Sequence, residues 1–103
     1  MTSMPGEPPG KPVRFRPEAR AEALEAFDWY EARDPSVADR FDESLREAVR
    51  RVGRHPHLFP HYPGHQVARF LRLNGFPYLV IYRELDHECE LVAVAHASRQ
   101  PRY

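Results

Sequence analysis

The pair Asp34-Pro35 constrains this chain more than any other feature, because it ends one predicted helix and begins the next. Aspartate is a favoured N-cap residue, and proline suits the first helical position, where its missing N–H is no loss. No residues remain there for a strand or a long loop. The two helices are therefore expected to fold back on each other as an antiparallel hairpin.

Apolar residues with helical spacing lie on both sides of this junction. Pro17 suits the first turn of a helix that runs to about Arg33. Its apolar stripe consists of Leu24, Phe27 and Tyr30. The stripe of the second helix consists of Val37, Phe41, Leu45, Ala48 and Val52. Gly53 is the expected terminator of this second helix.

Strand patterns follow an irregular, proline-rich loop at residues 55–64. The expected strands are residues 67–73, 78–83 and 89–96. Asn74-Gly75 between the first two is the strongest short hairpin signal, and residues 13–16 form one more short strand before the helices. The sequence therefore predicts an α+β fold (β-α-α-β-β-β). In it, the helical hairpin covers one face of a single sheet that contains a three-stranded antiparallel meander.

The 103 residues suffice for one domain with one hydrophobic core. Residues 1–12 contain four prolines and two glycines, and they cannot bury enough apolar area to offset the entropy of ordering. We therefore expect a flexible leader at residues 1–12 and a single domain at residues 13–103.

Charge and cysteine content limit the classes of function. The chain has 15 basic and 15 acidic residues, so it has no bulk attraction to nucleic acid or to an anionic membrane. Cys89 is the single cysteine, which excludes an internal disulfide, fits a reducing cytoplasm and suggests a small buried hydrophobic group. No apolar run approaches the roughly 20 residues that cross a bilayer. No P-loop or Gly-rich dinucleotide motif is present, so no cofactor is expected.

One histidine and several arginines stand on or after the predicted strands. His96 alternates with Val92 and Val94, which predicts that the three side chains share one face near the rim of the core. Imidazole suits proton transfer near neutral pH, yet His96 can equally be a satisfied polar group. The arginines in question are Arg69, Arg72, Arg83, Arg99 and Arg102. Adjacent strands lie about 5 Å apart, so these guanidinium groups can converge on one anion-binding patch or pair with glutamates such as Glu90.

The loop histidines suggest metal binding only weakly. His57, His61 and His65 have four-residue spacing, but the intervening prolines disfavour a helix there. Supporting acidic residues are also absent nearby. We expect no metal site.

Several motifs follow one another in a specific order. They are Trp29-Tyr30-Glu31, the helix with Phe41, Arg69, Phe76-Pro77-Tyr78-x-x-x-Tyr82-Arg83, and His96-x-x-Arg99-x-Pro101-x-Tyr103. Together with the order of elements over residues 13–103, they resemble the RelE/ParE toxin family of bacterial type II toxin–antitoxin modules. The resemblance implies a small toxin that a cognate antitoxin wraps and inactivates, and allows a toxin–antitoxin hetero-oligomer.

This resemblance leaves the activity open between two branches. RelE-like members are ribosome-dependent mRNA endoribonucleases, and for that branch it implies a catalytic set of His96, Arg69 and Arg83. ParE-like members inhibit DNA gyrase and are not nucleases. The resemblance favours the ParE-like branch, because Phe76-Pro77-Tyr78 and His96-x-x-Arg99-x-Pro101 are of a kind widespread among ParE-like members. The chain is also neutral, and its strands lack the lysines that commonly accompany RNA cleavage in the other branch. A non-toxic remnant that only binds an antitoxin is a third alternative.

The resemblance also implies two binding surfaces. Residues for the gyrase target or for ribosome-bound mRNA would be Arg72, Arg99, Arg102 and Tyr103. Residues for the antitoxin would be Phe27, Trp29 and Tyr30, because a domain this small can scarcely bury all its aromatic side chains.

Overall fold

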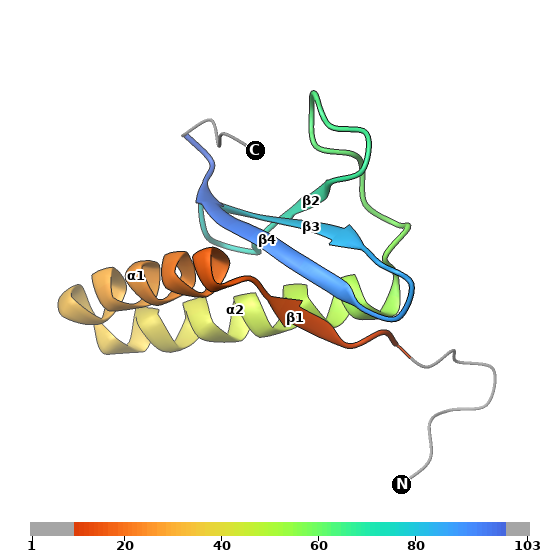
Figure 1. Cartoon of the computed structure of the whole chain (residues 1–103). Helices are drawn as coiled ribbons and strands as arrows, with labels where there is room; N and C mark the ends of the chain where they lie inside the picture. The colour runs from red at the N-terminus through yellow and green to blue at the C-terminus, as the bar shows by residue number, and fades with distance from the viewer. Residues whose placement is uncertain (1–9, 99–103) are drawn as a thin grey trace, which may run out of the picture.

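The computed structural model describes residues 10–98, which form two helices and a four-stranded sheet. The helices are α1 (Pro17–Arg33) and α2 (Pro35–Arg54). The strands are β1 (Val13–Phe15), β2 (Arg69–Arg72), β3 (Tyr78–Glu84) and β4 (Cys89–His96). The two helices lie against one face of the sheet (Figure 1). The predicted α+β fold is confirmed, and neither helix has the length and hydropathy needed to span a membrane.

Asp34 joins the two helices as the sequence predicts. Its carboxylate accepts hydrogen bonds from the Ser36 hydroxyl at 2.8 Å and from the Ser36 backbone N–H at 3.0 Å. These hydrogen bonds lower the pKa of the Asp34 carboxyl group. The Asp34 backbone N–H donates to the Tyr30 carbonyl at 2.8 Å and closes α1. One residue thus ends the first helix and caps the second.

Gly53 does not terminate α2 as predicted but lies inside it, since the helix continues to Arg54. The chain crosses this position at Lys11, whose N–H donates to the Gly53 carbonyl at 2.9 Å. A Cβ atom at residue 53 would stand 2.7 Å from the Lys11 carbonyl oxygen, closer than real Cβ contacts. The missing side chain therefore lets residues 10–12, which the sequence places in the leader, pack against α2.

We expect Gly53→Ala to lower the free energy of unfolding by about 1 kcal/mol, although alanine usually stabilises a helix. Alanine gains roughly 1 kcal/mol in helical propensity, but overpacking against fixed backbone costs about 1–3 kcal/mol. Urea unfolding measures the difference, with Glu43→Ala at an exposed position of α2 as the control. A Gly53→Ala protein more stable than the parent would contradict this account of the crossing.

The sheet has the strand order β1-β4-β3-β2. The meander of β2, β3 and β4 is antiparallel as predicted, whereas β1 adds to β4 in parallel. Gly75 takes a φ of +83° in the turn between β2 and β3, a conformation that favours glycine. The main core lies between the helices and the sheet and includes Phe41, Leu45, Val52, Val80, Tyr82, Leu91 and Val94. Cys89 is fully buried as expected, and burial raises the pKa of its thiol.

A β-bulge changes which side chains of β4 share a face. The register shifts between Ile81 and Tyr82 of β3, so Val92 is an extra residue on β4. Val94 packs in the core beneath the helices, whereas Val92 packs on the opposite face of the sheet. The predicted common face of Val92, Val94 and His96 is therefore wrong for Val92. Alternation in the sequence cannot show an inserted residue.

Candidate functional site

The three residues proposed as a catalytic set do not lie together. Arg69 pairs across the strands with Tyr82, and His96 pairs with Tyr78. Four positions along β3 separate these pairs, which corresponds to about 13 Å. Arg83 follows Tyr82 on the same strand, so its side chain points to the opposite face of the sheet. Within the described residues, Arg69 and Arg83 therefore do not converge with His96 on one patch.

Arg69 and His96 each have local contacts that suffice to explain them as structural residues. Arg69 Nη1 donates to the Phe59 carbonyl at 2.6 Å and ties the loop before β2 to the sheet. The His96 ring packs against Tyr78 at 5.2 Å between ring centroids. Its Nδ1 accepts a hydrogen bond from the Ser98 backbone N–H at 3.2 Å. No hydrogen bond or ion pair within residues 10–98 links His96 to an arginine.

Arg83 belongs to an ion-pair network around Glu90. The strand registers place Arg14, Glu90 and Arg83 in one row across β1, β4 and β3. Arg83 Nε lies 2.7 Å from Glu90 Oε1, and Arg14 Nη2 lies 2.9 Å from Glu90 Oε2. Arg16 Nε approaches Glu90 Oε2 at 3.6 Å. The alternative that strand arginines pair with glutamates is confirmed for Arg83.

Glu90 is the one buried charged residue in the described part of the chain, with 5% of its surface exposed. Burial by itself raises the pKa of Glu90, but hydrogen bonds from Arg83 and Arg14 outweigh it and lower the pKa. Glu90 is therefore ionised at neutral pH. Sequence reasoning missed the contributions of Arg14 and Arg16, because they depend on the parallel pairing of β1 with β4.

Only some of the residues predicted to bind a target or a metal ion lie within the described part of the chain. Arg72 is exposed at the end of β2. Arg99, Arg102 and Tyr103 lie outside the described residues. His57 lies 3.2 Å from Glu84, and no group of three histidine, cysteine or acidic side chains within residues 10–98 has a metal-binding arrangement.

The three aromatic residues expected to bind an antitoxin lie in different surroundings. Tyr30 packs in an aromatic cluster, with its ring centroid 5.2 Å from that of Phe76. Trp29 is 53% exposed, and the Arg33 guanidinium stacks over its ring at 3.5 Å. Phe27 is half-buried and lines a groove between the helices. The three residues therefore do not form one surface: Phe27 lines that groove, Tyr30 lines a different hollow, and Trp29 lies exposed on α1.

This helical groove has a volume of about 700 Å³ and lies between α1 and α2 beside β1. Its apolar lining consists of Phe15, Ala23, Leu24, Phe27, Phe41, Leu45 and Val49. Its charged lining consists of Arg20, Asp39, Asp42, Arg46 and Arg50. Leu24 is 57% exposed in the groove. An apolar lining with charged neighbours suits the apolar face of a bound helix or extended segment.

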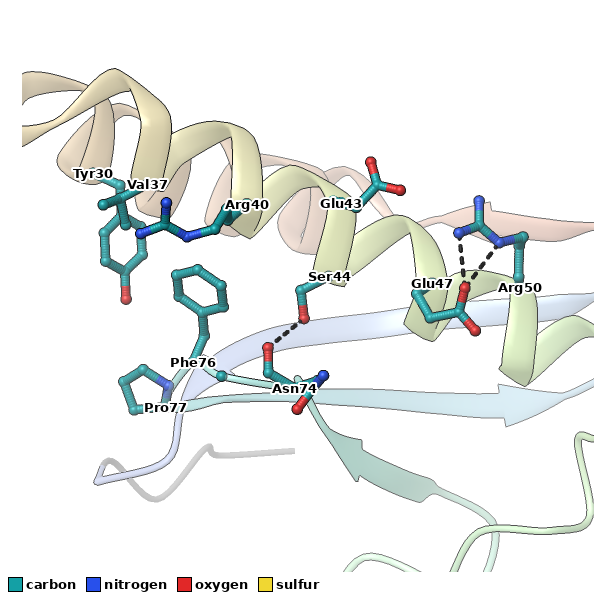
Figure 2. Close-up of a pocket in the computed structure, with 11 residues that line it drawn as sticks. Tyr30, Val37, Arg40, Glu43, Ser44, Glu47, Arg50, Asn74, Phe76 and Pro77 are labelled. Carbon is teal, nitrogen blue, oxygen red and sulfur yellow. Dashed lines mark hydrogen bonds and ion pairs between the residues drawn. The ribbon is translucent and has the colours of Figure 1, made fainter.

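A second hollow of about 670 Å³ lies between α2 and the turn that joins β2 to β3 (Figure 2). The Ser44 hydroxyl donates to the Asn74 carbonyl at 2.8 Å and ties the helix to the turn. Arg50 donates two hydrogen bonds to Glu47, and Glu43 points away from the hollow (Figure 2). Because Ser44, Asn74, Glu47 and Arg50 already bond within this hollow, the more apolar helical groove is the better candidate for a binding site.

The fold and the groove define a class of protein. It is a small α+β domain with a groove on a helical hairpin, in which Arg69 and Arg83 lie apart from His96. Residues 13–101 match the family described as the ParE toxin of the type II toxin–antitoxin system parDE. Toxin ParE2 of Mycobacterium tuberculosis is 32% identical over 83 residues, which cover 76% of this chain and 73% of that toxin. The chain belongs to the ParE toxin family of type II toxin–antitoxin systems.

Solved structures share the same fold. A chain of the chromosomal ParDE TA system from P. aeruginosa superposes with a TM-score of 0.72 at 17% identity. That match covers 84% of this chain and 95% of the other. The YoeB dimer from Staphylococcus aureus gives a TM-score of 0.54 at 13% identity, with coverage of 82% and 94%. At these identities the likeness concerns the fold alone.

Proposed function

We propose that this chain is a ParE-like toxin that inhibits DNA gyrase in the cytoplasm and that a cognate antitoxin neutralises. The separation of Arg69, Arg83 and His96 in the structure is the main observation that favours gyrase inhibition over RNA cleavage. Acid–base cleavage of a phosphodiester requires a proton-transfer group and cations within reach of one phosphate. Inhibition of a target by binding requires no such arrangement.

The distribution of charge supports the same choice. Glu90 accepts a hydrogen bond from Arg83 Nε and forms a longer ion pair with Arg16, and the chain has no net formal charge. Proteins that bind nucleic acid derive much of their affinity from cations that neutralise phosphates. The carboxylates of Glu88 and Glu90 leave the face that carries Arg83 with little net positive charge, which disfavours a ligand with many phosphates such as a messenger RNA.

The helical groove supports the antitoxin part of the proposal. Its apolar lining includes Phe15 of β1, Leu24 and Phe27 of α1 and Val49 of α2. A partner segment with an apolar face gains free energy by covering these side chains. Trp29 lies outside the groove lining and is available for a separate contact.

The purified toxin is expected to block supercoiling of relaxed plasmid DNA by gyrase and to leave translated mRNA intact. His96→Ala should inhibit gyrase as strongly as the parent, because this residue has no catalytic role in the proposal. Supercoiling assays and primer extension on ribosome-bound mRNA measure the two activities side by side. Ribosome-dependent cleavage that is lost in His96→Ala would overturn the proposal in favour of a RelE-like nuclease. Inactivity in both assays would indicate a non-toxic remnant.

A further inference from the structure

A small cavity of about 250 Å³ lies on the face of the sheet opposite the helices. Ile81 and Val92 contribute apolar surface from the sheet, and Tyr62 contributes a wall from the loop before β2. Arg16 and Arg83 supply positive charge at the same cavity. The helical groove shares none of these residues. The two sites are therefore independent.

Both arginines of this cavity are anchored on the same buried carboxylate. Arg83 Nε lies 2.7 Å from Glu90, and Arg16 Nε lies 3.6 Å from it. The two side chains nevertheless stay 43% and 44% exposed. No hydrogen bond to a described residue engages the terminal Nη groups of either arginine. A hydrogen bond thus fixes the inner end of Arg83, an ion pair orients that of Arg16, and both guanidinium groups have free donors on their outer ends.

Charge and volume limit what these free donors can bind. The surrounding network contains three arginines and two glutamates, including Arg14 and Glu88, and so has one net positive charge. The cavity is smaller than the roughly 300–1,000 Å³ of a typical small-molecule pocket. A polyanion would also bring further phosphates close to Glu88, which is half-buried beside Arg14. One carboxylate on a short apolar stem satisfies these limits.

We propose that Arg16 and Arg83 bind one acidic side chain, glutamate or aspartate, of a protein partner. The carboxylate accepts hydrogen bonds from the free Nη groups, and its methylene groups contact Ile81 and Val92. Carboxylates bind guanidinium groups strongly because the two groups match in charge and in planar geometry. This site goes beyond the proposed function, because it lies on the other face of the sheet from the helical groove and does not depend on the target.

The test titrates N-acetyl-glutamate α-amide, which has one carboxylate, into the isotope-labelled full-length chain and follows the arginine Nε–H signals by NMR. Saturable shifts are expected for Arg16 and Arg83 and should be absent with the corresponding glutamine compound. Arg83→Gln should abolish saturation. Arg72→Gln removes an exposed arginine that does not line this cavity and should leave the shifts unchanged.

Three results would overturn the acidic-side-chain site. The first is the absence of saturable shifts, and the second is an equal loss in Arg72→Gln. The third is a short single-stranded RNA, such as an octamer of uridine, that shifts the same signals at lower concentration than the glutamate compound. The first two results do not bear on gyrase inhibition or on antitoxin binding at the helical groove, so in those cases the two proposals fail separately. The third result would in addition remove the charge argument against a messenger RNA target, which the supercoiling and primer-extension assays test directly.

Discussion

Leu24→Glu is expected to weaken binding of the cognate antitoxin by about 100-fold, which corresponds to roughly 2.7 kcal/mol. Leu24 is 57% exposed in the free toxin and lies in the helical groove beside Phe27. A bound partner would bury this position, and burying an unpaired carboxylate against apolar side chains is strongly unfavourable. In the free toxin the new carboxylate remains in water, so the free energy of unfolding should change little.

Leu58→Glu provides the matched control for this prediction. Leu58 is 63% exposed but lies in the loop before β2, outside the helical groove. Titration calorimetry with the purified antitoxin measures both affinities, and urea unfolding verifies that both variants are folded. Unchanged affinity in Leu24→Glu would refute the groove as the antitoxin site. So would an equal loss of affinity in Leu58→Glu.

Glu90→Gln is expected to lower the free energy of unfolding by about 2 kcal/mol at pH 7, the typical contribution of hydrogen bonds to charged groups. Glu90 is buried, whereas its arginine partners are close to half exposed. After the substitution, water can hydrate the arginines. The free energy of unfolding therefore falls by less than it would on breaking a fully buried ion pair. Glutamine has nearly the same shape, so the change isolates the charge.

The effect of Glu90→Gln should depend on pH in a defined direction. The pKa of Glu90 in the folded protein lies below its ordinary value of 4.5, so the unfolded chain binds this proton more readily. Ionised Glu90 therefore makes its full contribution to the free energy of unfolding well above pH 4.5. This contribution is lost as the pH falls through the lowered pKa. Urea unfolding of both proteins between pH 7 and pH 3 measures how the difference between their free energies of unfolding narrows.

Glu47→Gln is the control for this pH dependence. Glu47 pairs with Arg50 on the surface of α2, where both side chains are about half exposed. Exposed ion pairs contribute little, so its loss should scarcely change stability at any pH. A constant difference between parent and Glu90→Gln across the whole pH range would show that packing, and not charge, accounts for the role of Glu90.

The sequence predicted the candidate site less well than the fold, for a reason visible in the strands. Arg69 and Arg83 both belong to the sheet, and sequence analysis allowed them to converge with His96. Their distribution over two faces follows from the pairing of Arg69 with Tyr82, the residue before Arg83. Outside a bulge, neighbouring residues of a strand point to opposite faces. The register decides which residues of different strands share a face, and it is a tertiary property.

Local signals determined most of the fold of this protein. The cap at Asp34, the helical stripes and the Asn74-Gly75 turn each act within a few residues, so the sequence by itself specified two helices and a meander. Tertiary structure decided the parallel pairing of β1 with β4, the bulge at Val92 and the crossing of Gly53 by Lys11. These features depend on contacts between segments far apart in the chain, where packing overrides local preference.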